Sequence, residues 1–333
     1  MFSSYDIARK ADVVFSEALS VDQFKQLDKE GVHIIHRTDD IVFYKKRKFT
    51  LRENDVIFTH TGNLNNLFYL LKNLNEKMNL TLVTHQSDRM IDEDIFNKKP
   101  SCIKKWYALN SDYLNDNLIP LPLGVANEYS YKKNIIKNQL PKELKIDRYE
   151  KKENLVYINF TESTNYKERS WIKDYFSSYT WAIVEDSELS IKEYIDKIKK
   201  TTFVICPWGN GVDSHRIWET LSLGSIPIVK KHLTFKNLSE LPILFVNDFK
   251  EINEKMLINY LSDFGKRDFN LDLLTSDYWG DYIKKGIVKG DKKIQVNESN
   301  LIFYFYYFQS DLKSRLNNYA KKINYYIRKI KQR

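Results

Sequence analysis

The chain has 333 residues, of which 42% are hydrophobic and 14% aromatic, with only 7 prolines and 10 glycines. This composition excludes disordered, collagenous and low-complexity proteins and predicts a globular chain of one large or two ordinary domains. The net charge of +9 suits a polyanionic partner, an anionic membrane surface or a phosphorylated ligand. Cys102 and Cys206 lie far apart without a C-x-x-C pattern, which argues against a disulfide framework or a structural zinc site.

The N-terminal residues predict a cytoplasmic protein. Charges at Asp6, Arg9, Lys10 and Asp12 precede any long apolar stretch, which is typical of neither a signal peptide nor a membrane anchor. The sequence also has no run of about 18 uncharged apolar residues. We therefore expect a cytoplasmic location. Peripheral contact with the inner face of the membrane is an open alternative that depends on the C-terminal segment, residues 301–333.

Short β-branched and aromatic runs alternate with helical patterns along the chain. In the first part we expect strands at 12–16, 32–36, 55–59, 80–84 and 119–123, and a helix at 63–76. The alternation then restarts, with strands at 155–160, 181–184, 203–207, 226–229 and 243–246 and helices at 167–176, 191–199 and 214–223. This order predicts an α/β fold with two parallel sheets covered by helices.

A polar, lysine-rich stretch at 132–154 separates the two sets of elements. The domain organisation that we predict is an N-terminal domain at 1–135, a linker at 136–153, a second domain at 154–300 and a helical tail at 301–333. In open parallel sheets, ligands bind at the carboxyl ends of the strands. We therefore expect functional residues directly after strands, on both sides of a shared cleft.

The segment FVICPWGNGVDSHRIWETLSLGSIPIV, residues 203–229, carries the clearest site pattern. A strand runs into a glycine loop, Asp213 or Ser214 is placed to cap the next helix, and Gly224 is placed to end it. The N-terminus of such a helix favours a bound anion. Arg216 can grip a diphosphate there, and Glu219, on the same helical face, can accept hydrogen bonds from ribose hydroxyls. Judged by residue types alone, a surface Arg216–Glu219 pair beside an ordinary turn explains the pattern equally well.

This segment resembles the donor-binding motif of exostosin-type glycosyltransferases. The motif consists of a strand, a Pro/Gly loop, an Asp-Ser-x-Arg-x-(Trp/Phe)-Glu run and a Gly-x-Ile-Pro-Val turn. The matching residues are Pro207, Gly209, Asp213, Ser214, Arg216, Trp218, Glu219, Gly224, Ile226 and Pro227. The resemblance implies the GT-B fold, in which two Rossmann-like domains share a cleft and the second one binds the nucleotide sugar. It also implies that Arg216 binds the donor diphosphate, that Glu219 binds the ribose, and that transfer inverts the anomeric configuration.

We predict further donor contacts around this motif. The loop candidates are Pro207, Gly209, Asn210, Gly211, Asp213, Ser214 and His215. Asn159 lies at the end of the first strand of the second set, and Thr161 and Arg169 follow it. In GT-B enzymes the loop after this strand faces the donor phosphates. A solvated loop and helix start is an equally good interpretation of these three residues.

Glycosyl transfer requires a base that deprotonates the acceptor hydroxyl, and we expect it on the opposite domain. Asp88, His60 and His85 follow predicted strands there, and Asp88 and His60 rank first. A hydrogen-bonded strand-end residue is the alternative for each. The Glu-x7-Glu pair of many retaining enzymes is absent at Glu219, because Gly211 occupies the position eight residues earlier. This absence also favours inversion.

The triplet Asp92-Glu93-Asp94 is the one candidate for the Asp-x-Asp metal pair of other glycosyltransferases. It lies in a helix-like segment, where acidic residues near the N-terminus are favoured by the helix dipole alone. We therefore predict no metal and no cofactor, with the nucleotide-diphosphate sugar as co-substrate.

The tail combines an apolar run at 301–308 with a helical stripe surrounded by Lys and Arg. The stripe consists of Leu312, Leu316, Tyr319, Ile323, Tyr326 and Ile330. Packing against protein, a short coiled coil and an amphipathic helix on an anionic membrane are three open interpretations.

The sequence thus predicts an inverting, metal-independent glycosyltransferase that extends a surface polysaccharide or lipid-linked glycan. Its expected partners are a nucleotide sugar and a saccharide or glycolipid acceptor. A nucleic-acid-binding protein is the rival from another class, suggested by the net charge with 22 Tyr and 19 Phe. No nucleic-acid-binding motif is present, so we expect no such partner. A catalytically silent scaffold of the same fold is a further alternative.

Overall fold

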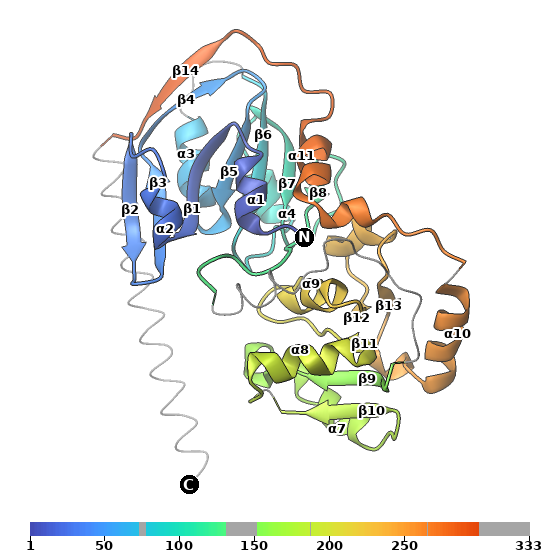
Figure 1. Ribbon diagram of the computed structural model, residues 1–333. Coiled ribbons are helices and arrows are strands. Elements are labelled where there is room, and N and C mark those ends of the chain that lie inside the picture. The colour runs from blue at the N-terminus through green and yellow to red at the C-terminus, as the bar shows by residue number, and fades with distance from the viewer. Residues whose placement is uncertain (73–77, 131–151, 187, 265, 300–333) are drawn as a thin grey trace.

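The computed structural model describes residues 1–72, 78–130, 152–186, 188–264 and 266–299. They form two lobes, each built on its own sheet, and the N-terminus lies between the lobes (Figure 1). The prediction of a mixed α/β protein with parallel sheets is confirmed. Most of the predicted linker at 136–153 and all of the tail at 301–333 fall outside the described residues.

The first lobe contains a seven-stranded mixed sheet. In spatial order its strands are β2 (Val32–Arg37), β3 (Ile41–Lys46), β1 (Val13–Ser20), β5 (Val56–His60), β6 (Leu80–His85), β7 (Ile103–Ala108) and β8 (Leu118–Pro120). The pairs from β1 through β8 are parallel, whereas β3 pairs antiparallel with both β1 and β2. The expectation of a purely parallel sheet was wrong here, because the chain turns directly after β2 and Thr38 N–H bonds to the Ile41 carbonyl at 2.8 Å.

The helices of the first lobe are short. They are α1 (Ser4–Arg9), α2 (Val21–Lys25), the 3-10 turn η1 (Thr61–Asn63), α3 (Leu64–Lys72) and α4 (Glu93–Asn97). The predicted helix at 63–76 corresponds to α3, which buries Leu64, Leu67 and Leu71. These apolar residues recur at helical spacing, so the helix presents one face to the core of the lobe.

The second lobe contains a five-stranded sheet in which every pair is parallel. Its strands in spatial order are β10 (Ala182–Glu185), β9 (Asn154–Asn159), β11 (Thr201–Ile205), β12 (Ile226–Lys230) and β13 (Leu244–Val246). The connecting helices are α6 (Tyr166–Arg169), α7 (Ile172–Ser177), α8 (Ile191–Lys199) and α9 (His215–Ser222), with 3-10 turns η2 (Glu162–Thr164), η3 (Leu233–Leu238) and η4 (Phe249–Glu251). The strand order reverses at β9, so the loops after β9 and β11 diverge and open a crevice.

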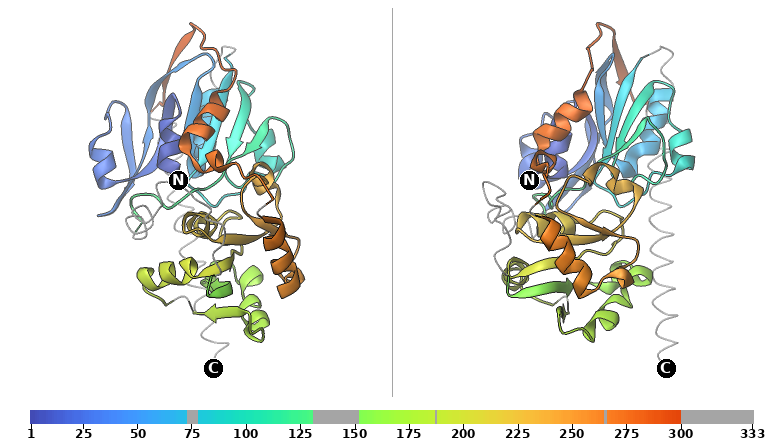
Figure 2. Two further views of the ribbon diagram at one scale, coloured as in Figure 1. Left: turned by 45° about the vertical axis from the view of Figure 1, so that its right-hand side comes forward. Right: turned by 90° about the vertical axis from the view of Figure 1, so that its right-hand side faces the viewer.

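After α10 (Glu254–Phe264) and η5 (Leu271–Leu274), the chain returns to the first lobe (Figure 2). There α11 (Ser276–Lys284) contacts α1, and β14 (Lys293–Asn297) pairs antiparallel with β4 (Lys48–Arg52). Beyond β14, Glu298 is buried and accepts a hydrogen bond from Lys45 Nζ at 2.7 Å. The sequence placed residues 276–297 in the second domain, whereas the structure places them on the first lobe.

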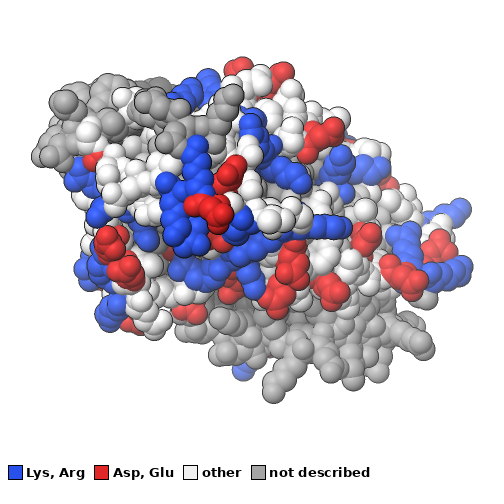
Figure 3. Space-filling view, turned by 90° about the horizontal axis from the view of Figure 1, so that it is seen from above, with Lys and Arg blue, Asp and Glu red and all other residues white. Residues whose placement is uncertain are grey.

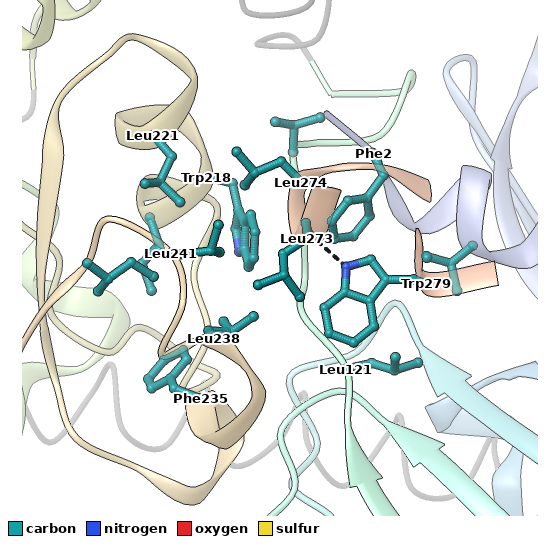
Figure 4. Close-up of a cluster of buried hydrophobic side chains, with 14 of the residues drawn as sticks. Phe2, Leu121, Trp218, Leu221, Phe235, Leu238, Leu241, Leu273, Leu274 and Trp279 are labelled. Carbon is teal, nitrogen blue, oxygen red and sulfur yellow. Dashed lines mark hydrogen bonds between the residues drawn. The ribbon is translucent and has the colours of Figure 1, made fainter. Parts of the chain in front are cut away.

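A single apolar cluster joins the two lobes (Figure 4). Trp218 and Leu238 come from the second lobe, and Phe2 comes from the first. Phe2 and Trp218 contact each other edge to face, with ring centroids 5.5 Å apart. Leu273 and Leu274 lie in the middle of the cluster, and the indole Nε1–H of Trp279 donates to the Leu273 carbonyl at 2.8 Å. Because this core is shared, the carboxyl ends of both sheets face each other in a defined arrangement.

None of the helices described is long and apolar enough to cross a membrane.

Candidate functional site

A pocket of about 410 Å³ lies between the lobes. Its walls come from the loops that follow β6, β7, β9 and β11 and from the first turns of α9, at the crevice where the strand order of the second sheet reverses. The lining residues are Ser4, Gln86, Ser87, Asp88, Leu109, Leu123, Asn127, Tyr129, Thr164, Arg169, Gly209, Asn210, Gly211, Asp213, Ser214, His215, Arg216 and Glu219. Most of the residues that the sequence predicted in the glycine loop and helix therefore face one pocket.

The glycine loop packs directly against the first lobe. A Cβ atom on Gly211 would lie 2.7 Å from Asn110 Nδ2 and 3.2 Å from Asp88 Oδ1. Real Cβ contacts are not this short with a buried amide, so any larger residue would push the loop and the first lobe apart. Gly211 thus allows the loop of one lobe to approach the acidic side chain of the other.

Helix α9 begins and ends as the sequence predicts, but its cap differs. Gly224 follows the helix with a φ of +73°, the left-handed conformation that favours glycine. Ser214 occupies the N-cap position without making a side-chain cap bond. Its buried Oγ has no hydrogen-bond partner among the described residues, and neither has the buried Nδ2 of Asn110. Unsatisfied buried polar atoms are costly, so these two beside the loop are consistent with a polar ligand.

Asp213 connects the lobes instead of capping α9. Its Oδ2 accepts a hydrogen bond from Leu123 N–H at 2.8 Å, and its Oδ1 accepts one from Trp218 Nε1–H at 2.9 Å. Its own N–H donates to Asn110 Oδ1 at 3.1 Å. The side chain is buried, and this burial raises the pKa of Asp213 to about 7. His215 makes a parallel connection, since its Nδ1 lies 2.8 Å from the Gly124 carbonyl oxygen.

The raised pKa of Asp213 predicts a pH-dependent stability. The folded protein binds more protons at this carboxyl than the unfolded chain does between about pH 4 and pH 7. The stabilisation relative to Asp213→Asn should be fully present below pH 4 and lost as the pH rises through about 7, by up to about 1.4 kcal/mol per pH unit. Urea unfolding of both proteins from pH 5 to 8 measures the free energy of unfolding of wild type relative to that of Asp213→Asn. An increase of this relative stability with pH would contradict the assignment.

Arg216 and Glu219 lie on one face of α9 and share a partner. Tyr194 on α8 donates its hydroxyl hydrogen to Glu219 Oε2 at 2.8 Å and accepts a hydrogen bond from Arg216 at 3.1 Å. Glu219 and Tyr194 are buried, with 1% and 5% of their surface exposed. Tyr194 therefore fixes the positions of both predicted donor-binding side chains.

Arg169 is a second guanidinium at the pocket. It is 6% exposed and donates to the carbonyl oxygens of Pro207, Trp208 and Thr161 at 3.0, 2.7 and 2.8 Å. Burial and the nearby charge of Arg216 lower the pKa of Arg169 to about 10. Neither arginine forms an ion pair with a carboxylate among the described residues. Glu219 interacts electrostatically with Arg216, and three backbone carbonyl groups hold Arg169, so both guanidinium groups are fixed at one pocket.

Three of the predicted donor residues do not line the pocket. Asn159 donates its side-chain amide to the Asp186 carbonyl at 2.5 Å, whereas Thr161 is exposed. Neither residue lines the pocket, nor does Pro207. The carbonyl groups of Thr161 and Pro207 hold Arg169, so their contribution to the site is indirect.

The three candidate bases differ in access to the pocket. Asp88 is exposed and lines it, opposite the glycine loop. His85 is fully buried, with Nδ1 accepting from Gln86 N–H at 2.9 Å and Nε2 at 3.0 Å from the Pro122 carbonyl. His60 packs on Phe43 and its Nδ1 accepts from Gly62 N–H at 3.0 Å. Burial lowers the pKa of each histidine to about 4. The structure brings only Asp88, of these three, to the pocket surface.

Sequence reasoning missed several polar residues on the first-lobe wall. Asn127 accepts hydrogen bonds from Ser4 Oγ at 2.7 Å and donates to the Tyr129 hydroxyl at 2.8 Å. Gln86 has a φ of +64° and donates to Ser4 Oγ at 3.0 Å. No local motif marks these side chains, because tertiary contacts between the N-terminus and strand-end loops bring them together.

The acidic triplet on α4 has a structural role in the described structure. Asp92 caps the helix, and its Oδ1 accepts a hydrogen bond from Ile95 N–H at 2.8 Å. Among the residues that the structure describes, no group of three or more His, Cys, Asp or Glu side chains is arranged to hold a metal ion.

The glycine loop, both arginines and Glu219 all fall in a segment that matches a known family. Residues 145–260 match the family described as RXYLT1 C-terminal domain, which is an exostosin-like, glycosyltransferase-related family. The match supports a glycosyltransferase family. It covers about a third of the chain and contains the second-lobe wall of the pocket, including α9. A search of curated proteins gives no match.

Proposed function

We propose that the protein is an inverting, metal-independent glycosyltransferase of the GT-B type. The observation that carries the proposal is the convergence of Arg169, Arg216 and the α9 N-terminus on one pocket, opposite the exposed carboxylate of Asp88. Cationic groups on one wall and a potential base on the other are what transfer from a nucleotide-diphosphate sugar requires.

The second lobe would bind the donor. A diphosphate placed at the N-terminus of α9 would accept hydrogen bonds from the helix and from the planar fork of Arg216. Arg169 adds positive charge, and the unsatisfied Oγ of Ser214 adds a hydroxyl donor at the same place. Glu219 would accept hydrogen bonds from the ribose, held in position by Tyr194.

The first lobe would bind the acceptor, a saccharide of a surface polysaccharide or a lipid-linked glycan. In the proposed step, Asp88 takes the proton of an acceptor hydroxyl while the oxygen of that hydroxyl attacks the anomeric carbon. The bond from that carbon to the diphosphate oxygen breaks, and the nucleoside diphosphate leaves with the electron pair. Attack from the face opposite the leaving group inverts the configuration. Arg216 and Arg169 stabilise the negative charge that develops on the leaving group.

Two alternatives differ from this proposal in what they predict. A non-catalytic scaffold would bind nucleotide sugars without consuming them. A nucleic-acid-binding protein would bind polyanions in preference to nucleoside diphosphates, with a steep dependence on salt. Both arginines line a pocket between the lobes, and this favours a small ligand. We further propose a cytoplasmic enzyme whose tail, residues 301–333, contacts an anionic membrane.

A thermal-unfolding panel of nucleotide sugars, carried out with and without EDTA, tests the proposal. A bound ligand at 100 times its Kd should raise the free energy of unfolding by about 2.7 kcal/mol. We expect this stabilisation from nucleotide-diphosphate sugars, unchanged by EDTA, because arginines and helix N–H groups neutralise the phosphates. If EDTA abolished the stabilisation and manganese restored it, metal independence would be contradicted. If none of the nucleotide sugars stabilised the protein, donor binding would be contradicted.

A further inference from the structure

A second pocket, of about 460 Å³, opens at the other end of the first sheet. It is lined by residues near the amino ends of β5, β6 and β7 and by the end of α11 with the segment that follows it, among them Asn54, Lys104, Lys105, Lys285 and Val288. The interlobe pocket lies at the carboxyl ends of the same strands. The length of a six-residue strand, roughly 20 Å, therefore separates the two pockets.

The lining of this second pocket is positively charged. Lys104, Lys105 and Lys285 line it, and no acidic residue does. None of these three lysines forms an ion pair among the described residues. Figure 3 views the molecule from above, where Lys and Arg gather across the middle of the surface with some Asp and Glu among them.

Two of the acidic residues nearby, Asp12 and Asp55, form ion pairs with other lysines, whereas the Glu53 side chain lies beside Gly290. Lys289 forms ion pairs with Asp12 and with Asp55, the latter at 3.0 Å, and Lys284 lies 4.0 Å from Asp12. These carboxylates are therefore not available to balance the lining lysines. Burial together with repulsion from Lys104 lowers the pKa of Lys99, a further sign of excess positive charge at this end of the sheet.

An exposed aliphatic side chain, Val288, lines the same pocket. Val288 is 79% exposed, and the side chain of Asn54 donates to its carbonyl oxygen at 2.7 Å, which holds the segment in place. Lysines around an exposed aliphatic residue match a membrane interface, where the apolar group enters the headgroup layer and the ammonium groups contact phosphates. No aromatic side chain lines the pocket, so a nucleic acid would find no base-stacking group there.

We propose that this basic face, formed by Lys104, Lys105, Lys285 and Val288, docks the protein on anionic phospholipid membranes. The inference requires neither the tail nor the proposed transferase activity, because it rests on described residues outside the interlobe pocket.

Flotation of the full-length chain with lipid vesicles tests the proposal. We expect binding to vesicles that contain phosphatidylglycerol, weaker binding at higher salt, and none to vesicles of phosphatidylcholine alone. The combined variant Lys104→Gln, Lys105→Gln, Lys285→Gln should lower the partition coefficient by roughly 100-fold, because each lysine near an anionic surface contributes roughly fivefold. Val288→Ser should weaken binding while leaving the charge unchanged.

A matched variant removes the same charge elsewhere. Lys192, Lys236 and Lys255 are exposed on the second lobe, and replacing all three by Gln should change vesicle binding by less than twofold. Thermal unfolding of both triple variants checks that they remain folded. An equal loss of vesicle binding in the two triple variants would show that binding depends on net charge alone, and this would overturn the proposal. Unchanged vesicle binding in the first variant would do the same, as would loss of RNA or DNA binding with vesicle binding retained.

Discussion

Replacing Arg216 by alanine should weaken the binding of the nucleoside diphosphate by well over tenfold and leave the fold intact. Arg216 lies in the first turn of α9, and its guanidinium donates a hydrogen bond to the Tyr194 hydroxyl at 3.1 Å. Loss of a charged hydrogen bond to a desolvated phosphate costs about 2–5 kcal/mol. Calorimetric titration of wild type and variant with the best ligand of the panel measures the change.

Three further variants make this test specific. Arg216→Lys keeps the charge but not the planar fork, so its affinity should fall between those of wild type and Arg216→Ala. Glu219→Ala should also abolish donor binding, since it removes the proposed ribose contact. Arg267→Ala removes an exposed arginine from the same lobe and should have no effect. Wild-type affinity in folded Arg216→Ala and Glu219→Ala would refute the assignment of the donor site.

Replacing Asp88 by asparagine should lower kcat by roughly 10²–10⁴-fold while nucleotide affinity stays unchanged. General-base catalysis contributes a factor of this size, and asparagine keeps the shape of the side chain but cannot take a proton. Initial rates of sugar transfer and separate nucleotide titrations distinguish kcat from binding.

Asp94→Asn is the matched control for Asp88→Asn. Asp94 is an exposed acid in the first turn of α4, on the same lobe and outside the interlobe pocket. We expect wild-type activity from it. If Asp94→Asn lost activity while Asp88→Asn kept it, the base assignment would be wrong and the acidic triplet on α4 would gain a role.

The sequence predicted the elements whose signals are local. Helix α8 was predicted to within a residue, and α9 follows from an amphipathic run that ends before Gly224. Arg216 and Glu219 were placed on one face because residues three apart on a helix are neighbours. The loop that follows β11 was also correctly expected at the carboxyl end of a parallel strand, because a strand, a glycine loop and a helix follow one another in the sequence.

The remainder depends on contacts between distant residues. The sequence pattern of β14 contains no sign that it pairs with β4, about 240 positions earlier, because pairing is decided by which sheet edge is reachable. Asp213 has the residue type of a helix cap, but the approach of Leu123 from the other lobe makes it an interlobe acceptor. Tyr194 looks like an ordinary apolar position of α8, and its bridging role appears only once α8 lies beside α9.

The most direct test of the central claim follows each nucleotide sugar by ³¹P NMR in the presence of wild type or Arg216→Ala, with a mixture of saccharide acceptors. We expect the diphosphate signals of at least one donor to broaden with wild type and to convert to those of free nucleoside diphosphate, and we expect neither change with Arg216→Ala. Broadening without conversion would contradict catalysis and indicate a scaffold. Conversion at equal rates by both proteins would contradict the interlobe pocket as the site of transfer.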